Sequence, residues 1–315
     1  KTFYFTPLRE FKDLIISGAI VYNEKVALHL SRIFDGEVDF IFVDSEKKIK
    51  KSNIHIGETA NIERTVKENI KFSKLFTYKG NDLTVEALDL LLSNLNIDNL
   101  KGLGSKKISI LGAGNLGSKI ALKLLERGAD IKIYRRDLNK LKIISKALNY
   151  IKPSSTEAKL SYSKNIYNVS KNADIIIGCS DGIPIIDNKM IEQANKGLII
   201  VDVGKGTIKN EVLKNKNISS IKIFRLDITA ALYGMLQSNL YFQKFLRKKI
   251  NSNYYDKYRV ISGGVFGYEN DIVVDDAKKP KKLYGLSDGK GDIKNIYTKK
   301  EKKIIKLFSK KFLNE

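Results

Sequence analysis

The chain is poor in the residues that form disulfides and metal sites. Its 315 residues include one cysteine, Cys179, and two histidines, His29 and His55. A single cysteine excludes an internal disulfide, and two histidines far from it in sequence do not form a metal-binding cluster. We therefore expect a site without a metal ion.

Long apolar runs are also missing. The longest apolar stretches fall short of the length needed to cross a membrane, and no secretory signal peptide is recognisable. We therefore expect a cytoplasmic protein that has no membrane partner.

Acidic residues are few beside the basic ones, and the formal net charge is +22. The lysines are scattered over the whole chain, and no zinc-finger, RNA-recognition or basic-zipper pattern accompanies them. We therefore expect no nucleic-acid partner. The charge favours a small anionic ligand through electrostatic steering.

The most informative pattern present is a glycine loop between a strand pattern and a helical pattern. Buried-strand residues up to Leu111 lead into a G-x-G-x-x-G loop, and helical spacing follows from 118 to 127. The glycines permit a tight turn, close approach of the backbone to a pyrophosphate, and close packing of helix on strand, while exposed amides at the helix start face the phosphates. The sequence predicts a dinucleotide site that comprises Gly112, Gly114, Asn115, Leu116 and Gly117.

The end of the next strand indicates which dinucleotide binds. NAD-binding versions carry an acidic residue about 20 positions after the loop, which holds the ribose 2′-hydroxyl. Here Tyr134, Arg135 and Arg136 fill that place, and the first carboxylate is Asp137. Because a guanidinium matches a 2′-phosphate, the sequence favours NADP over NAD.

Strand and helix patterns alternate along the middle of the chain, which predicts an α/β protein with a mostly parallel sheet. We expect two α/β domains, residues 1–100 for substrate and 101–230 with a Rossmann-type doubly wound sheet, and a C-terminal extension at 231–315. The middle domain is expected to have strands at 107–111, 130–134, 174–178, 198–203 and 221–226.

Further patterns flank the middle domain. The spacing predicts helices over 11–30, 59–76 and 83–95, the last with Asn81 or Asp82 as its cap, and strands over 37–44 and 54–56. After the middle domain it predicts a helix from 231 to 249, strand-like segments over 259–288 with turns near Gly267 and Pro280, and a helix from 298 to 312.

Four segments together resemble the shikimate dehydrogenase family. Gly80-Asn81-Asp82 is similar to its Asn-Thr-Asp-Gly segment, and Tyr134-Arg135-Arg136 to the Asn-Arg-Thr segment that binds the 2′-phosphate. The loop from Cys179 to Gly182 resembles the family's loop beside the nicotinamide. The strand at 200–204 and the later Gly-Met-Leu segment at 234–236 complete the match. The wider amino-acid-dehydrogenase-like superfamily also contains methylene-tetrahydrofolate dehydrogenases.

This resemblance implies roles for individual residues. Asp82 would contact substrate and work beside a lysine, for which Lys79 and Lys67 are candidates, with Asn81 as a weaker catalytic candidate. Cys179, Ser180 and Gly204 would line the cofactor pocket, and Gln237 would bind substrate. Tyr78, next to Lys79, is a further candidate proton donor. The resemblance also implies that the helix beginning at Ala231 returns to the first domain.

The chain departs from the family's pattern in the first domain. The Ser-x-Ser motif for the substrate carboxylate and the segment that supplies the catalytic lysine have no clean counterpart, and Gln237 follows Met235 by two residues instead of three. We therefore expect an NADP-dependent oxidoreductase that acts on a small anionic molecule other than 3-dehydroshikimate. A methylene-pterin or methylene-folate dehydrogenase and a non-enzymatic NADP-binding sensor or scaffold stay open as alternatives, as does a homodimer.

Overall fold

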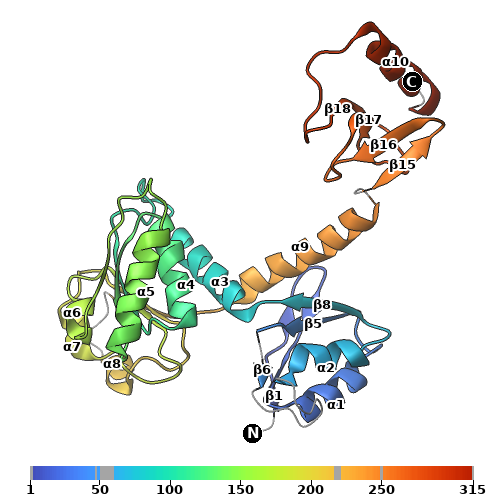
Figure 1. Cartoon of the computed structure of the whole chain (residues 1–315). Coiled ribbons are helices and arrows are strands. Elements are labelled where there is room, and N and C mark those ends of the chain that lie inside the picture. Colours follow the sequence, from blue (N-terminus) through green and yellow to red (C-terminus); the bar gives the residue numbers. More distant parts are fainter. Residues whose placement is uncertain (1–2, 47, 50–59, 216–220, 249–250, 314–315) are drawn as a thin grey trace. The chain divides into compact units, whose positions relative to one another are not determined.

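A computed structural model describes residues 3–46, 48–49, 60–215, 221–248 and 251–313 (Figure 1). By its internal contacts the chain divides into two units, Lys1–Tyr233 and Gly234–Glu315. The boundary falls within helix α9 (Thr229–Lys248). The strand expected at 54–56, with His55, lies outside the described residues.

A six-stranded parallel sheet forms the centre of the first unit. Its order is β11-β10-β9-β12-β13-β14, so the strands follow the 3-2-1-4-5-6 order of the doubly wound dinucleotide fold. This order confirms the expected Rossmann-type sheet. The bounds are β9 (Lys107–Leu111), β10 (Asp130–Tyr134), β11 (Leu160–Tyr162), β12 (Ile175–Gly178), β13 (Ile199–Asp202) and β14 (Lys222–Arg225).

Helices cover both faces of this sheet because its strands are apolar on both sides. On β9, Ile108 and Ile110 belong to one buried cluster and Leu111 to another, and all are at most 1% exposed. The first cluster includes residues of α4 (Asn115–Glu126) and α5 (Leu138–Ile151). The second contains residues of α6 (Ile166–Ser170), α7 (Asn188–Glu192) and α8 (Asn210–Lys214).

The N-terminal region has a smaller α/β arrangement of its own. Strands β5 (Phe40–Asp44) and β8 (Lys74–Tyr78) pair in parallel, and Ala27 of α1 (Glu24–Phe34) and Val66 of α2 (Ile62–Asn69) pack with Val43 of β5 in one core. Short antiparallel pairs complete the region: β1 (Phe3–Phe5) with β4 (Ala19–Val21), β2 (Arg9–Glu10) with β3 (Ile15–Ile16), and β6 (Lys48–Ile49) with β7 (Ala60–Asn61).

Helix α3 (Gly80–Leu95) follows β8 and packs on α4, next to the six-stranded sheet. Leu88 and Leu92 on α3 are buried in the same core as Ile120 and Leu124 of α4. Asp89 of α3 is 2% exposed and pairs with Arg127 at 2.5 Å. The helix whose first turn carries Asp82 therefore shares a core with the helix that follows the glycine loop.

The C-terminal unit contains a four-stranded sheet in the order β15-β16-β17-β18, and α10 (Lys299–Phe312) packs against it. Phe308 of α10 is fully buried with Val260, Ile272 and Leu286 from the sheet. Thr298 and Glu301 form a capping box at the start of α10. The strands are β15 (Ser252–Tyr255), β16 (Tyr258–Ser262), β17 (Glu269–Val274) and β18 (Leu283–Asp288), which confirms the expected strands over 259–288.

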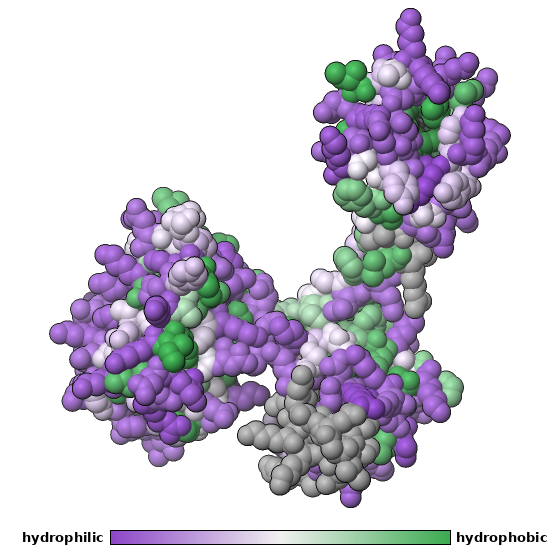
Figure 2. Space-filling view, in the orientation of Figure 1, coloured by the Kyte–Doolittle hydropathy of each residue, from purple (hydrophilic) through white to green (hydrophobic). Residues whose placement is uncertain are grey.

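Hydrophilic residues cover most of the face in view in Figure 2. Among the described residues, each helix is too short or too polar to cross a bilayer.

Two expected helices near the N-terminus are wrong in part. Residues 11–30 contain β3, β4 and only the first part of α1, because the β-branched residues at 15–16 and 20–21 pair with β2 and β1. In place of the helix expected over 59–76, the described residues form α2, which ends at Asn69, and then the first residues of β8. Helix α3 begins at Gly80 with Lys79 as its cap residue, so Asp82 lies inside the first turn instead of capping the helix.

The α3 core contact predicts a difference between two leucines on one helix. Replacing Leu92, which is fully buried, by alanine should lower the free energy of unfolding by about 2–5 kcal/mol. The same change at Leu90, which is 39% exposed, should lower it by much less. Urea unfolding measures both, and equal losses would contradict the packing of α3 on α4.

Candidate dinucleotide site and active site

The glycine loop closes tightly against the end of β10. The carbonyl oxygen of Tyr134 accepts hydrogen bonds from the amides of Gly112 and Ala113 at 3.0 and 2.9 Å. Gly112 has a φ of 117°, and a Cβ there would lie 2.5 Å from the carbonyl oxygen of Cys179. Only glycine meets both conditions, so the loop can pass between β10 and the loop after β12.

The other two glycines of the motif lie in opposite surroundings. A Cβ on Gly117 would collide with the carbonyl oxygen of Gly112, so this glycine is needed for packing of α4 on the loop. A Cβ on Gly114 would meet open space within 4 Å. Gly114 is the cap residue of α4 and makes no side-chain cap, so the first amides of α4 have room for an anion beside them.

Arg135 lies against the glycine loop. Its Nη1 donates to the carbonyl oxygen of Ala113 at 2.9 Å, while the neighbouring Arg136 is exposed. The nearby carboxylate of Asp137 caps α5 by accepting from the amide of Lys140 at 3.0 Å, and this hydrogen bond lowers the pKa of Asp137. At the end of β10, Arg135 therefore lies against the glycine loop, whereas the carboxylate of Asp137 belongs to the cap of α5.

The loops after β12 and β13 pack against each other next to the glycine loop. A Cβ on Gly204 would lie 3.1 Å from the amides of Ser180 and Asp181. The buried carboxylate of Asp202 accepts from the amide of Gly206 at 2.7 Å and from the Thr207 hydroxyl at 2.8 Å, which fixes the second loop.

Cys179 lies in this area as a protected thiol. Burial, together with the charge of Asp202, raises the pKa of Cys179 to about 12. The thiol is therefore protonated at neutral pH, which disfavours a nucleophilic role. Its backbone lies against Gly112, where a Cβ would be 2.5 Å from the Cys179 carbonyl oxygen.

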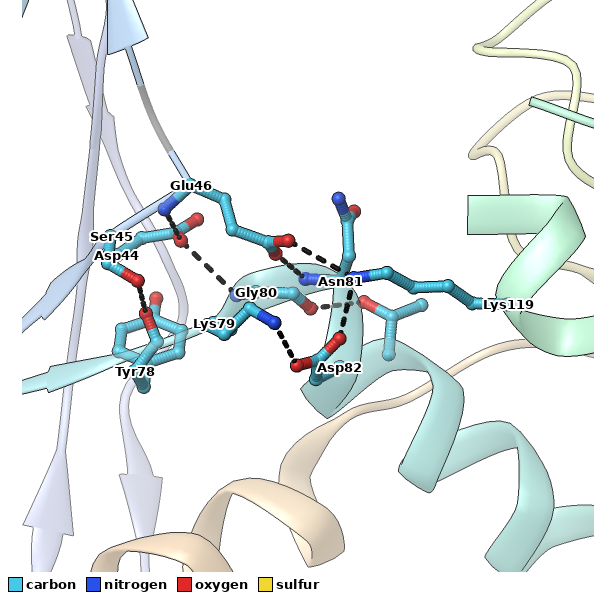
Figure 3. Close-up of polar contacts among 10 residues, drawn as sticks. Asp44, Ser45, Glu46, Tyr78, Lys79, Gly80, Asn81, Asp82 and Lys119 are labelled. Atoms are coloured by element: carbon cyan, nitrogen blue, oxygen red, sulfur yellow. Dashed lines mark hydrogen bonds and ion pairs between the residues drawn. The ribbon is translucent and has the colours of Figure 1, made fainter. Parts of the chain in front are cut away.

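A second polar cluster lies at the start of α3 (Figure 3). Lys79 Nζ lies 2.7 Å from Oδ2 of Asp82, and Lys119 Nζ lies 2.6 Å from Oδ1 of the same carboxylate. Lys79 comes from the connection between β8 and α3, whereas Lys119 comes from α4. Each carboxylate oxygen of Asp82 thus faces a different ammonium group.

Two carboxylates at or just after the end of β5 hold the start of α3 in place. Glu46 accepts from the amide of Asn81 at 2.5 Å and lies 3.3 Å from Lys119 Nζ. Asp44 accepts from the amide of Gly80 at 3.2 Å, and a Cβ on Gly80 would lie 2.6 Å from Asp44 Oδ2. The glycine before Asn81 is therefore required by the close approach of Asp44.

These contacts set the charge of the cluster. Hydrogen bonds from Lys119 and then Lys79 lower the pKa of Asp82, so this carboxylate is ionised at neutral pH. The hydrogen bond to Asp82 raises the pKa of Lys119. Burial and the charge of Asp44 raise the pKa of Tyr78 to about 12, so its phenol stays protonated.

The structure brings together three of the four predicted catalytic residues: Lys79, Asn81 and Asp82 all lie at the start of α3. Lys67 lies on α2 and pairs with Glu63 of the same helix at 2.5 Å.

Gln237, the predicted substrate-binding residue, lies on α9, in the C-terminal unit. The start of α9 contacts the N-terminal region, since the ring of Tyr233 stacks on Phe11 at 4.5 Å and Arg9 donates to Thr229.

The sequence did not identify Lys119, Asp44 and Glu46. The two carboxylates could have been suspected, because ligands bind beyond the carboxyl ends of parallel strands and both residues lie at or just after the end of β5. In the sequence, nothing distinguishes Lys119 from a surface lysine, because its contact with Asp82 depends on the packing of α3 on α4.

Comparison with known proteins concerns mainly the part of the chain that contains the large sheet. Residues 94–227 match the family model described as shikimate / quinate 5-dehydrogenase. This stretch of the chain is therefore similar to the domain that the family model describes. The match covers all six strands of the large sheet and confirms the resemblance seen in the sequence. The start of α3, with Asp82, precedes the matched stretch.

The chain is also similar to other dehydrogenases. It is 30% identical over 112 residues to glycerol-3-phosphate dehydrogenase [NAD(P)+] of Thermoanaerobacter sp. (strain X514), and this match covers 34% of each chain. The match therefore spans about a third of that relative's length.

Solved structures overlap with the chain in part. L-tryptophan dehydrogenase from Nostoc punctiforme is 17% identical, with a TM-score of 0.43 over 68% of this chain and 59% of that one. An L-alanine dehydrogenase is 19% identical, with a TM-score of 0.36 over 53% and 54% of the two chains.

Because Gly114 and Gly117 have different surroundings, replacement by alanine should have different effects at the two positions. Replacing Gly114 by alanine should leave the melting temperature almost unchanged and weaken dinucleotide binding at least tenfold, because the added methyl fills the space beside the first amides of α4. Replacing Gly117 by alanine should lower the melting temperature itself. Scanning calorimetry and nucleotide titration measure both effects, and a destabilised Gly114→Ala protein would contradict the open space at that glycine.

Proposed function

We propose that the protein is an NADP-dependent oxidoreductase that transfers a hydride between the nicotinamide and a carbonyl or imine carbon of a small anionic substrate. The observation that carries this proposal is the carboxylate of Asp82, which lies between Lys79 and Lys119 in the same unit as the glycine loop. The shikimate dehydrogenase-like match of residues 94–227 supports the redox class.

The residues around the glycine loop fit NADP. The open space at Gly114 and the first amides of α4, at Asn115, Leu116 and Gly117, would hold the pyrophosphate. Arg135, with Tyr134 and Arg136 beside it, would hold the 2′-phosphate. The loops at Cys179, Ser180 and Gly204 would line the nicotinamide pocket.

The preference for NADP over NAD follows from the chemistry at the end of β10. Arg135 is next to the loop, and Asp137 is already used in the cap of α5. A guanidinium forms strong charge-assisted hydrogen bonds with a phosphate, and a bare hydroxyl offers it no such partner.

The bound cofactor supplies or accepts the hydride. In the direction of reduction, Lys79 would donate a proton to the substrate oxygen or nitrogen as the carbon gains the hydride, which leaves an alcohol or amine and a neutral lysine. Asp82 would hold the Lys79 ammonium in position, with Asn81 next to it on the same turn. Lys79, the more exposed of the two lysines on Asp82, could reach a ligand, and the positive charge there suits an anionic substrate.

One alternative is weaker on these observations, whereas a methylene-pterin or methylene-folate dehydrogenase stays open. A non-enzymatic NADP-binding sensor has no need for lysines on both oxygens of Asp82. The assignment of Lys67 to catalysis is also weaker, because its ammonium pairs with Glu63. Binding of substrate by Gln237 stays a prediction, as do a homodimer and the division between residues 1–100 and 101–230.

Cofactor choice is tested by comparing NADPH with NADH. We expect NADPH to raise the melting temperature more than NADH at equal concentration, and Arg135→Ala to weaken NADPH binding roughly 10- to 100-fold, as expected for one charged hydrogen-bonding group of about 1.5–3 kcal/mol. NADH binding should change little. Lys132→Ala, at an exposed lysine of β10, is the control. Equal shifts by the two nucleotides would contradict the role of Arg135.

The role of Asp82 in positioning Lys79 is tested with Asp82→Asn. A panel of small oxo acids and hydroxy acids, with NADPH or NADP⁺, should reveal a substrate, and the variant should turn it over at least 100-fold more slowly because Lys79 loses its anionic partner. NADPH binding should be unchanged. Asp98→Asn, at an exposed carboxylate, is the control. Unchanged turnover of Asp82→Asn would remove Asp82 from the mechanism.

A further inference from the structure

Lys119 has a position that the proposed reaction does not by itself explain. It lies on α4, four residues after Asn115, so it is on the same side of the helix as the first residue after the glycine loop. Its ammonium reaches Asp82 at 2.6 Å and Glu46 at 3.3 Å (Figure 3). One side chain thus joins the helix of the dinucleotide site to two carboxylates from other parts of the chain.

The two lysines on Asp82 differ in their surroundings. The side chain of Lys79 is 55% exposed and that of Lys119 is 32% exposed. Lys119 also contacts a second carboxylate, which favours its charged form further. An ammonium held by two carboxylates is poorly suited to give up a proton and well suited to hold those carboxylates in place.

We infer that Lys119 is a positioning residue, which couples dinucleotide binding at the start of α4 to the orientation of Asp82 and Glu46. This inference rests on the proposed function, because it assigns the anion at the start of α4 to a dinucleotide. A pyrophosphate bonded to the first amides of α4 orders that turn, and Lys119 is anchored one turn further on. The ordered Lys119 then holds Asp82, whose other oxygen is left for Lys79.

The amide of Asn81 is a direct reporter of this coupling. It donates to Glu46 Oε2, and Oε1 of the same carboxylate lies next to Lys119 Nζ. If nucleotide binding steadies Lys119, the hydrogen bond between Glu46 and the Asn81 amide opens less often. Exchange of the Asn81 amide with solvent deuterium then becomes slower.

The helix offers a matched control one turn after Lys119. Lys123 also reaches from α4 to α3, where its Nζ lies 3.3 Å from Glu86 and 3.7 Å from Asp89. Its partners lie further along α3, away from Asn81. Lys123→Met therefore removes the same charge from the same helix and leaves the contacts of Glu46 and Asp82 intact.

The experiment is residue-resolved hydrogen exchange of the full chain, with and without saturating NADPH. In the wild-type protein and in Lys123→Met, NADPH should slow exchange at Asn81 several-fold. Lys119→Met should bind NADPH within about threefold of the wild-type affinity and lose this slowing. Lys119→Arg, which keeps a cation at the position, should recover part of it.

The outcomes separate this inference from the proposed function. If Lys119→Met binds NADPH and still shows the wild-type slowing at Asn81, the coupling is wrong and the proposed function stands. If NADPH fails to bind the wild-type protein, both are wrong. Loss of the slowing in Lys123→Met as well as in Lys119→Met would also overturn the specific role of Lys119.

Discussion

The packing of α3 on α4 is the contact on which the candidate active site depends. Leu88 and Leu92 of α3 lie in one core with α4, and Asp89 pairs with Arg127 across the same interface. Because this interface fixes the two helices side by side, the carboxylate of Asp82 lies within reach of Lys119. The polar cluster is therefore a consequence of an apolar contact that lies further along the same helices.

In the proposed function, the glycine loop would bind the cofactor and the polar cluster would supply the proton. The loop has no charged side chains of its own and offers backbone amides, with open space at Gly114. The cluster carries three carboxylates, Asp44, Glu46 and Asp82, and two lysines, and it joins the end of β5 to the start of α3. Both lie in the unit Lys1–Tyr233, so a cofactor at the loop and a proton donor in the cluster would be held by the same part of the chain.

The sequence predicted best where the structure depends on local patterns. Strands β9, β10, β12, β13 and β14 were predicted because their continuous apolar runs alternate with helical spacing, and the glycine loop was predicted from its fixed offsets. The end of α2 and the start of β8 were missed because pairing of β8 with β5 decides them. Lys119 was missed because its contact with Asp82 spans 37 positions and depends on tertiary packing.

A crystal structure of the protein with NADPH would show directly whether the nicotinamide faces Asp82 and Lys79. We expect the pyrophosphate at the first amides of α4, the 2′-phosphate within hydrogen-bonding distance of Arg135, and the nicotinamide beside the loop at Cys179, on the side of Asp82 and Lys79. A nicotinamide directed away from Asp82, or a nucleotide bound elsewhere than the glycine loop, would contradict the proposed function.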